Sequence, residues 1–151
     1  MIVKDVTQHT WAAKTLKRSE SELRDFVENG SLGLQWIGPD GTVLWANQTE
    51  SELLGYTRDE YVGQHVSGLY VDQPVIEDIL ARLKSGETLL DYTARLRHKD
   101  GSIRHVMINS NALVEDGKFI HTRCFTHDIT EQTHAQEALR ESEAFNRSII
   151  Q

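Results

Sequence analysis

The chain has 151 residues, 38% hydrophobic and 26% charged, which suits one domain with a sizeable core and short appendages. Its net charge of −7 at pH 7 argues against a nucleic-acid-binding surface, because phosphate groups bind to basic faces. The single cysteine excludes an internal disulfide, and the sequence has no signal-peptide pattern and no apolar run near the ~20 residues of a membrane span, so we expect a cytoplasmic protein.

Residues 8–28 are predicted to form an N-terminal connector helix, because they contain many good helix formers and no Gly or Pro. Asp5 stands at the start of a capping-box pattern ahead of this helix. Apolar residues at heptad spacing predict a weak coiled-coil seam, and hence a homodimer. The seam residues are Leu16, Leu23 and Phe26. An amphipathic helix that lies on its own domain fits the same spacing.

Between residues 32 and 47, two short apolar strands surround a Pro-Asp-Gly-Thr turn, which predicts a hairpin. Asn47 is a natural N-cap for a short helix that Gly55 closes. After further short helical pieces, Asp72 is expected to cap a longer helix that ends before Gly86. The apolar face of that helix consists of Val75, Ile76, Ile79, Leu80 and Leu83.

Three alternating strands follow as a meander, over residues 90–97, 103–114 and 119–128. Their period of two predicts that alternate residues of each strand share one face of that strand. The residues that share a face are Leu90, Tyr92, Ala94 and Leu96 in the first strand, Val106, Ile108, Ser110 and Ala112 in the second, and Ile120, Thr122, Cys124 and Thr126 in the third. Two strands, short helices, one longer helix and this meander make an α+β domain.

A second connector helix is predicted over residues 131–151, again behind a capping-box pattern that begins at Asp128. The segments 5–28 and 128–151 are identical at eight of 24 positions, always at an offset of 123 residues. The chain therefore nearly ends with the sequence pattern with which it begins.

The order of these elements and several short segments resemble a PAS sensor domain. "PDGTVLWANQTESELLGYTRDEYVG" is similar to the first half of such domains, and "LKSGE…ARLRHKDGSIRHV" to their third and fourth strands. "THDITEQ" is similar to the segment that ends the last strand and begins the exit helix. The resemblance covers roughly residues 20–135. It implies a five-stranded antiparallel sheet with short helices on one face, flanked by connector helices at both ends.

The resemblance also accounts for the terminal repeat. Residues 1–7 look like the last-strand tail of a preceding PAS unit, and residues 142–151 look like the start of a following one. We therefore expect a PAS domain at 29–130, between connector helices at 8–28 and 131–151, as one period of a tandem array in a larger protein. The alternative is one PAS domain with two helices that are similar by chance.

PAS domains either hold a small ligand or act as dimerising relays. By strand parity, nine side chains should line a cavity here, and their short hydroxyl and thiol groups would hydrogen-bond a ligand. The nine are Tyr92, Ala94, Leu96, Val106, Ile108, Ser110, Thr122, Cys124 and Thr126. The alternative is an ordinary core in which Ser and Thr bond neighbouring backbone groups.

Two cofactor classes known among PAS domains do not fit this sequence. Oxygen-sensing heme PAS domains carry their ligating His on the long helix, where this chain has Val75 and no His from Asp72 to Leu83. Flavin photosensors need a Cys in an Asn-Cys-Arg-Phe-Leu segment, whereas Cys124 lies on the last strand. No cofactor is therefore expected.

Metal and catalytic sites are not expected either. His105 and His121 fall on the outer sheet face among arginines, without a nearby carboxylate or thiolate to complete a metal site. The chain has no phosphate-binding Gly-rich loop and no Gly-x-Ser-x-Gly segment. Cys124 and His127 lie on opposite faces of a strand, so they form no catalytic dyad.

The resemblance implies a sensory or relay module of a multidomain signalling protein, of the sensor histidine kinase type in a two-component phosphorelay. Its partners would be flanking PAS or kinase domains and a second copy of the chain. Asp128, Ile129 and Thr130 join the last strand to the exit helix and are expected to transmit the signal. The alternatives are a heme or flavin sensor that uses other residues, and a ligand-free dimerisation spacer.

Overall fold

The computed structural model describes residues 2–150, with side chains described for residues 11–28 and 30–146. The elements, in order, are α1 (Ile2–Asn29), β1 (Gly33–Ile37), β2 (Val43–Ala46), α2 (Gln48–Leu53), α3 (Arg58–Tyr61), the 3-10 helix η1 (Val66–Leu69), α4 (Gln73–Lys84), β3 (Leu89–Arg97), β4 (Ile103–Glu115), β5 (Lys118–Asp128) and α5 (Thr130–Ile150). Residues 1–30 form one compact unit, and all residues from Ser31 onward form a second.

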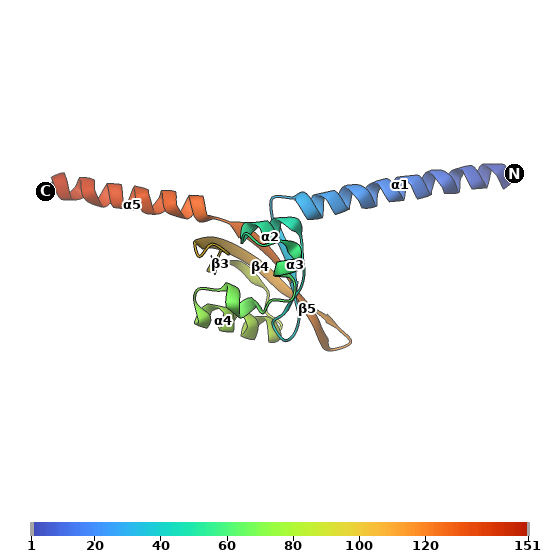
Figure 1. The fold of residues 1–151 in the computed structure, drawn as a ribbon. Coiled ribbons are helices and arrows are strands. Elements are labelled where there is room, and N and C mark those ends of the chain that lie inside the picture. Colours follow the sequence, from blue (N-terminus) through green and yellow to red (C-terminus); the bar gives the residue numbers. More distant parts are fainter. Residues whose placement is uncertain (1, 151) are drawn as a thin grey trace. The chain divides into compact units, whose positions relative to one another are not determined.

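The second unit is built on one five-stranded sheet with the order β2-β1-β5-β4-β3, in which every neighbouring pair is antiparallel. The predicted hairpin (β1–β2) and the predicted meander (β3–β4–β5) are both present. Helices α2, α3 and α4 lie on one side of this sheet (Figure 1). The predicted α+β architecture, with short helices on one face of a five-stranded antiparallel sheet, is confirmed.

The start of α2 follows its sequence signal, and the start of α4 follows its signal in part. Asn47 caps α2, since its Oδ1 accepts the N–H of Glu50 at 2.9 Å, and Gly55 ends that helix with a φ of +78°. Asp72 stands at the N-cap of α4 but makes no capping hydrogen bond. Its carboxylate instead binds the guanidinium of Arg95 through two bonds of 2.7 and 2.9 Å. The predicted position of the cap is therefore confirmed, but the side chain does not cap the helix.

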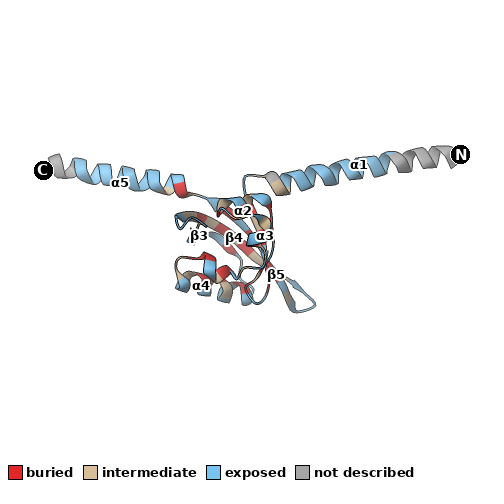
Figure 2. Ribbon diagram, viewed as in Figure 1, coloured by how far each residue is buried: buried red, intermediate tan, exposed pale blue. Residues whose placement is uncertain are grey.

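The core fills the space between the helices and the sheet, where Figure 2 shows the buried residues. As predicted, α4 turns an apolar face inward: Ile76, Ile79 and Leu83 are buried, and Val75 and Leu80 are half-buried against them. Burial of such side chains contributes roughly 1.5–3 kcal/mol each, so this face fixes α4 on the sheet.

Two irregularities break the predicted strand parity. The β3–β4 register shifts between Leu89 and Tyr92, where Asp91 has a φ of +50°, so Leu89 is buried and Leu90 is 74% exposed. The β4–β5 register shifts near the tip of the hairpin, and Ile120 is exposed there instead of buried. The prediction that Leu90 and Ile120 share a face with the buried residues of their strands is therefore wrong, because a strict period of two does not include a bulge.

The N-terminal unit differs from the prediction at its start. Helix α1 begins at Ile2, so residues 2–7 are helical and do not form the tail of a strand. Asp5 accordingly lies inside the helix and not at its cap. The predicted seam residues Leu16, Leu23 and Phe26 are all exposed on α1, and their role in a dimer stays a prediction.

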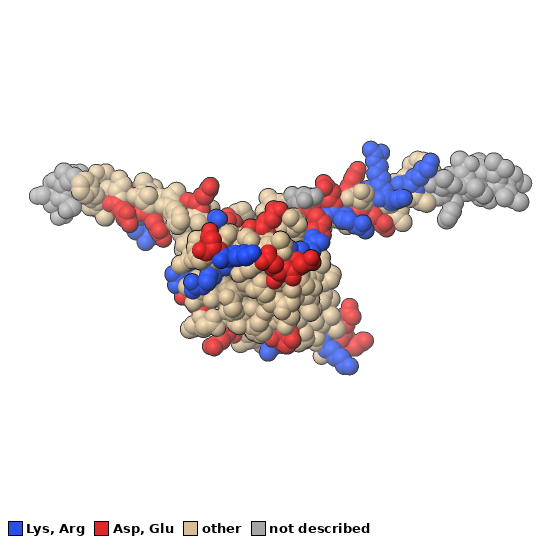
Figure 3. Space-filling model, viewed as in Figure 1, with Lys and Arg blue, Asp and Glu red and all other residues tan. Residues whose placement is uncertain are grey.

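On the face that Figure 3 shows, Lys and Arg side chains lie beside Asp and Glu side chains. None of the described helices has the length and apolarity needed to cross a membrane.

Candidate functional site: the sheet's inner face and the β5–α5 junction

The alternation of residues along β3, β4 and β5 predicted which side chains face the helices and the core. Of the nine predicted cavity residues, eight are buried, and Tyr92 is half-buried with its hydroxyl donating to Asp78 at 2.9 Å. The eight buried residues are Ala94, Leu96, Val106, Ile108, Ser110, Thr122, Cys124 and Thr126. Their placement on one face says nothing yet about a ligand, and that role stays a prediction.

A small void of about 10 Å³ lies between this face and α4. It is lined by Gln35, Ile37, Val66, Tyr70, Ile76, Ile79, Leu80, Leu83, Thr122 and Cys124. Only Thr122 and Cys124 of the predicted nine line it. The volume is about the minimum for one water, whereas sites for small organic ligands measure roughly 300–1,000 Å³.

The thiol of Cys124 is part of a hydrogen-bonded group on the sheet. Its Sγ lies 2.9 Å from Ser110 Oγ and 3.3 Å from Thr122 Oγ1, and the latter oxygen also accepts the N–H of Ile37 at 3.2 Å. Burial raises the pKa of the thiol, which keeps it protonated and unreactive. Here the Ser and Thr side chains hydrogen-bond to neighbouring groups of the core. This arrangement is that of an ordinary core, the alternative to ligand binding for the nine inner-face residues.

The three predicted relay residues form a compact junction between β5 and α5. The Asp128 carboxylate oxygen Oδ1 accepts from the Thr130 N–H at 2.9 Å and from the Thr130 hydroxyl at 2.6 Å. The junction is also bonded to β4: Ile129 N–H donates to the His105 carbonyl at 2.8 Å, and His105 N–H donates to Thr130 Oγ1 at 2.9 Å. Asp128 thus caps α5 by accepting the N–H of Thr130. The capping-box pattern predicted instead that it would accept the N–H of residue 131.

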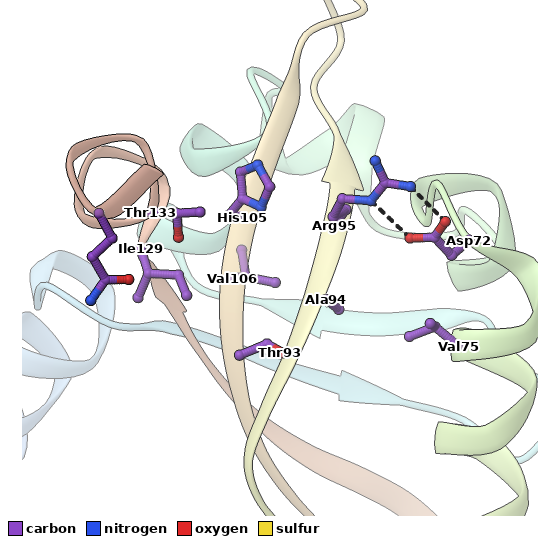
Figure 4. Close-up of a pocket in the computed structure, with 10 residues that line it drawn as sticks. Asp72, Val75, Thr93, Ala94, Arg95, His105, Val106, Ile129 and Thr133 are labelled. Atoms are coloured by element: carbon purple, nitrogen blue, oxygen red, sulfur yellow. Dashed lines mark hydrogen bonds and ion pairs between the residues drawn. The ribbon is translucent and has the colours of Figure 1, made fainter. Parts of the chain in front are cut away.

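A surface pocket of about 330 Å³ adjoins this junction. Figure 4 shows Ile129 and Thr133 on one side of it, beside His105 on β4, and the Arg95–Asp72 ion pair across β3. The guanidinium of Arg95 lowers the pKa of Asp72, so the pair is charged at neutral pH. Sequence reasoning missed this pocket, because its lining comes from α4, two strands and α5.

Sequence reasoning also missed Glu50, which is completely buried in the first turn of α2. Its Oε1 lies 3.2 Å from the Tyr61 hydroxyl oxygen, and that hydroxyl donates to Oε1 of Gln35 at 2.6 Å. Burial raises the pKa of Glu50 from 4.5 to about 7, against smaller lowering effects of the Thr126 and Tyr61 hydroxyls. A glutamate in a polar helical segment gives no sequence signal of burial.

His65 and His121 both have structural partners within the domain. His65 caps η1 by accepting from Ser67 N–H and lies 2.8 Å from the Asp40 carbonyl, packed against Gly41. His121 is buried on the outer face and stacks on Trp36 with ring centroids 4.5 Å apart. Among the residues that the structure describes, no three His, Cys, Asp or Glu side chains gather as a metal site would require.

The sequence model of the PAS domain family matches residues 14–131 of this chain. Hybrid signal transduction histidine kinase L of Dictyostelium discoideum is 21% identical over 131 residues, which are 86% of this chain and 8% of that protein. The PAS domain of an HTR-like protein from Haloarcula marismortui has the same fold, with a TM-score of 0.65, 21% identity, and coverage of 80% of this chain and 99% of that one.

A domain of the sensory box sensor histidine kinase/response regulator from Geobacter sulfurreducens also has this fold. Its TM-score is 0.61 at 24% identity, over 75% of this chain and 96% of that one. The TM-scores of 0.65 and 0.61 show that this chain shares the fold of both structures. Because the family model matches most of the chain, this chain belongs to the PAS domain family.

Proposed function

We propose that this PAS domain is a relay module within a longer signalling protein of the sensor histidine kinase type, located in the cytoplasm. The observation that carries the proposal is the junction of Asp128, Ile129 and Thr130, which bonds the start of α5 to both β5 and β4. A displacement of either strand must therefore move the first turn of α5. The partners would be flanking PAS or kinase domains, as the repeat at an offset of 123 residues suggests, and a second copy of the chain.

The void of about 10 Å³ favours relay without an organic ligand in the core. Ligand binding by the nine inner-face residues would require the core to expand. Native mass spectrometry of the purified chain distinguishes the two modes, since a retained small molecule would add a defined mass. An absorbance spectrum of protein expressed with heme and flavin available tests the cofactor alternative, and we expect no Soret or flavin band.

An insertion series in the intact parent protein tests the relay itself. Each residue inserted after Glu137 rotates the following helix by about 100°, so three or four residues should lock or invert output. Seven residues restore the heptad phase and should largely preserve regulation. Output is measured with and without stimulus for one to seven inserted residues. If regulation is retained with every number of inserted residues, α5 only connects the domains and the relay proposal is refuted.

A further inference from the structure

The buried carboxyl of Glu50 owes its position to the way α2 begins. Glu50 is the third residue of α2, and a glutamate there usually bonds back to the N–H of the capping residue. In this chain the N–H of Asn47 donates to the Leu34 carbonyl of β1 at 2.9 Å. Its usual partner is therefore occupied, and the Glu50 side chain lies in the core instead.

The environment of this carboxyl provides hydrogen bonds but no compensating positive charge. The titratable groups that face it are Tyr61 from α3, Tyr70 after η1, and Cys124 from β5. No lysine, arginine or histidine of the described part of the chain stabilises its ionised form. Oxygen Oε2 has no hydrogen-bond partner among the described residues and packs against the α-carbon of Gly33. An ionised carboxylate is costly in such a place.

The two protonation states of Glu50 require different hydrogen bonds around Tyr61. The Tyr61 hydroxyl has one proton, which it donates to Gln35 at the short distance of 2.6 Å. A protonated Glu50 can then donate its own proton to the Tyr61 oxygen, 3.2 Å away. An ionised Glu50 can only accept, so Tyr61 would have to turn from Gln35 to the carboxylate. The observed distances fit the protonated arrangement.

We propose that Glu50 is a proton-binding site, and that its protonation state sets the hydrogen bonds of Tyr61 and Gln35 and so biases the β5–α5 junction. The proton would thus be the stimulus of the module, an inference that rests on the relay function proposed above. The pKa of about 7 places this change near neutral pH.

The path from the carboxyl to the junction is short. Gln35 of β1 pairs directly with Cys124 of β5, and Gly33, on which Glu50 packs, pairs with Thr126. Thr126 lies two residues before Asp128 on the same strand. A change in β1 or at the Thr126 hydroxyl is therefore transmitted along β5 to the residue that caps α5.

The test is a carbon-13 NMR titration of glutamate side-chain carboxyls in the purified chain, from about pH 5 to about pH 9. We expect one glutamate to titrate near pH 7 in the wild type and in Glu52→Gln, and none to do so in Glu50→Gln. Glu52 is the matched control, since it is an exposed carboxyl on the same helix. Glu50→Gln resembles the protonated state and should fold. If no glutamate titrates above about pH 6, the proton site does not exist.

The same titration follows the backbone amides of Ile129 and Thr130. In the wild type, the chemical shifts of these two amides should change with pH at the midpoint at which Glu50 titrates. In Glu50→Gln this pH-dependent change should vanish. Shifts that persist unchanged in Glu50→Gln would come from other groups and would overturn the coupling. These measurements use this chain alone, whereas the insertion series uses the parent protein. A failed titration would therefore leave the relay proposal standing, and an insertion series without effect would leave the proton site standing.

Discussion

The hydroxyl of Thr130 donates to the carboxylate of Asp128 at 2.6 Å, which joins the first residue of α5 to the last residue of β5. The same oxygen accepts the N–H of His105 at 2.9 Å. One buried hydroxyl therefore holds together two strands and the exit helix, and its removal should separate the motion of the helix from that of the sheet.

We predict that Thr130→Val destabilises the domain by roughly 2 kcal/mol, because it leaves the N–H of His105 without its acceptor at similar side-chain volume. Hydrogen exchange should accelerate at the N–H of Thr133, which bonds to the Ile129 carbonyl in the first turn of α5. Thr130→Ser keeps the hydroxyl and should retain most of the protection. Equal exchange rates in both variants would show that the hydroxyl does not hold the helix.

Asn47 is predicted to be among the most sensitive positions of the domain. Its side chain is fully buried, and its Oδ1 accepts from both Leu34 N–H and Glu50 N–H while its Nδ2 donates to the Leu32 carbonyl. Asn47→Ala should lower the free energy of unfolding by roughly 3 kcal/mol, since a cap is lost and buried backbone groups lose their partners. Chemical denaturation measures this loss. The control Glu52→Ala, at an exposed position of the same helix, should change stability by about 0.5 kcal/mol or less; similar losses in the two variants would contradict the prediction.

The buried carboxyl gives a pH dependence of stability with a definite sign. The pKa of Glu50 is raised from 4.5 to about 7 on folding, so the folded state binds the proton more tightly than the unfolded chain. The free energy of unfolding should therefore fall as pH rises from about 4.5 to about 7, by up to roughly 3 kcal/mol, and level off above.

This contribution is isolated by comparison with Glu50→Gln, which cannot ionise. The difference in stability between the two proteins, from urea denaturation at several pH values, should grow in favour of the variant across that window. The carboxyl of Glu60 provides the contrast: the ammonium of Lys99 holds its pKa at about 2, so it contributes stability that is lost only in acid. A constant difference between wild type and Glu50→Gln would mean that Glu50 ionises as readily when folded as when unfolded.

The sequence predicted the features that depend on local pattern. The hairpin around the Pro-Asp-Gly-Thr turn, the cap at Asn47 and the apolar face of α4 each follow from neighbouring residues, and the structure confirms them. Strand parity likewise placed eight of the nine inner-face residues in the core. The errors at Leu90 and Ile120 come from bulges, which arise where two strands must fit each other and leave no mark in one strand's alternation.

What the sequence could not predict depends on contacts between distant segments. Asp72 has every local feature of a cap, yet Arg95, 23 residues away, binds its carboxylate. Glu50 has the spacing of an ordinary first-turn glutamate, and its burial follows only from the bond of Asn47 to β1. The size of the core void likewise depends on how α4 packs on the sheet, which no single segment specifies.

The last prediction concerns α1, on which Leu16, Leu23 and Phe26 are exposed at 61%, 63% and 72%. A helix with an uncovered apolar stripe gains stability from a partner. We expect the chain to dimerise through this stripe at high micromolar concentration. The double variant Leu16→Glu/Leu23→Glu should weaken dimerisation at least about a hundredfold, because each buried leucine contributes roughly 2 kcal/mol and each glutamate adds charge repulsion.

Analytical ultracentrifugation over a concentration series measures the dimer. The matched control is Lys14→Glu/Ser21→Glu, which adds two glutamates at the same seven-residue spacing on the opposite face of the helix, and it should still dimerise. A dimer that both variants weaken equally would reflect total charge and not the stripe. A wild-type chain that stays monomeric would leave α1 without a partner in this chain, and its partner would then have to be a neighbouring domain of the parent protein.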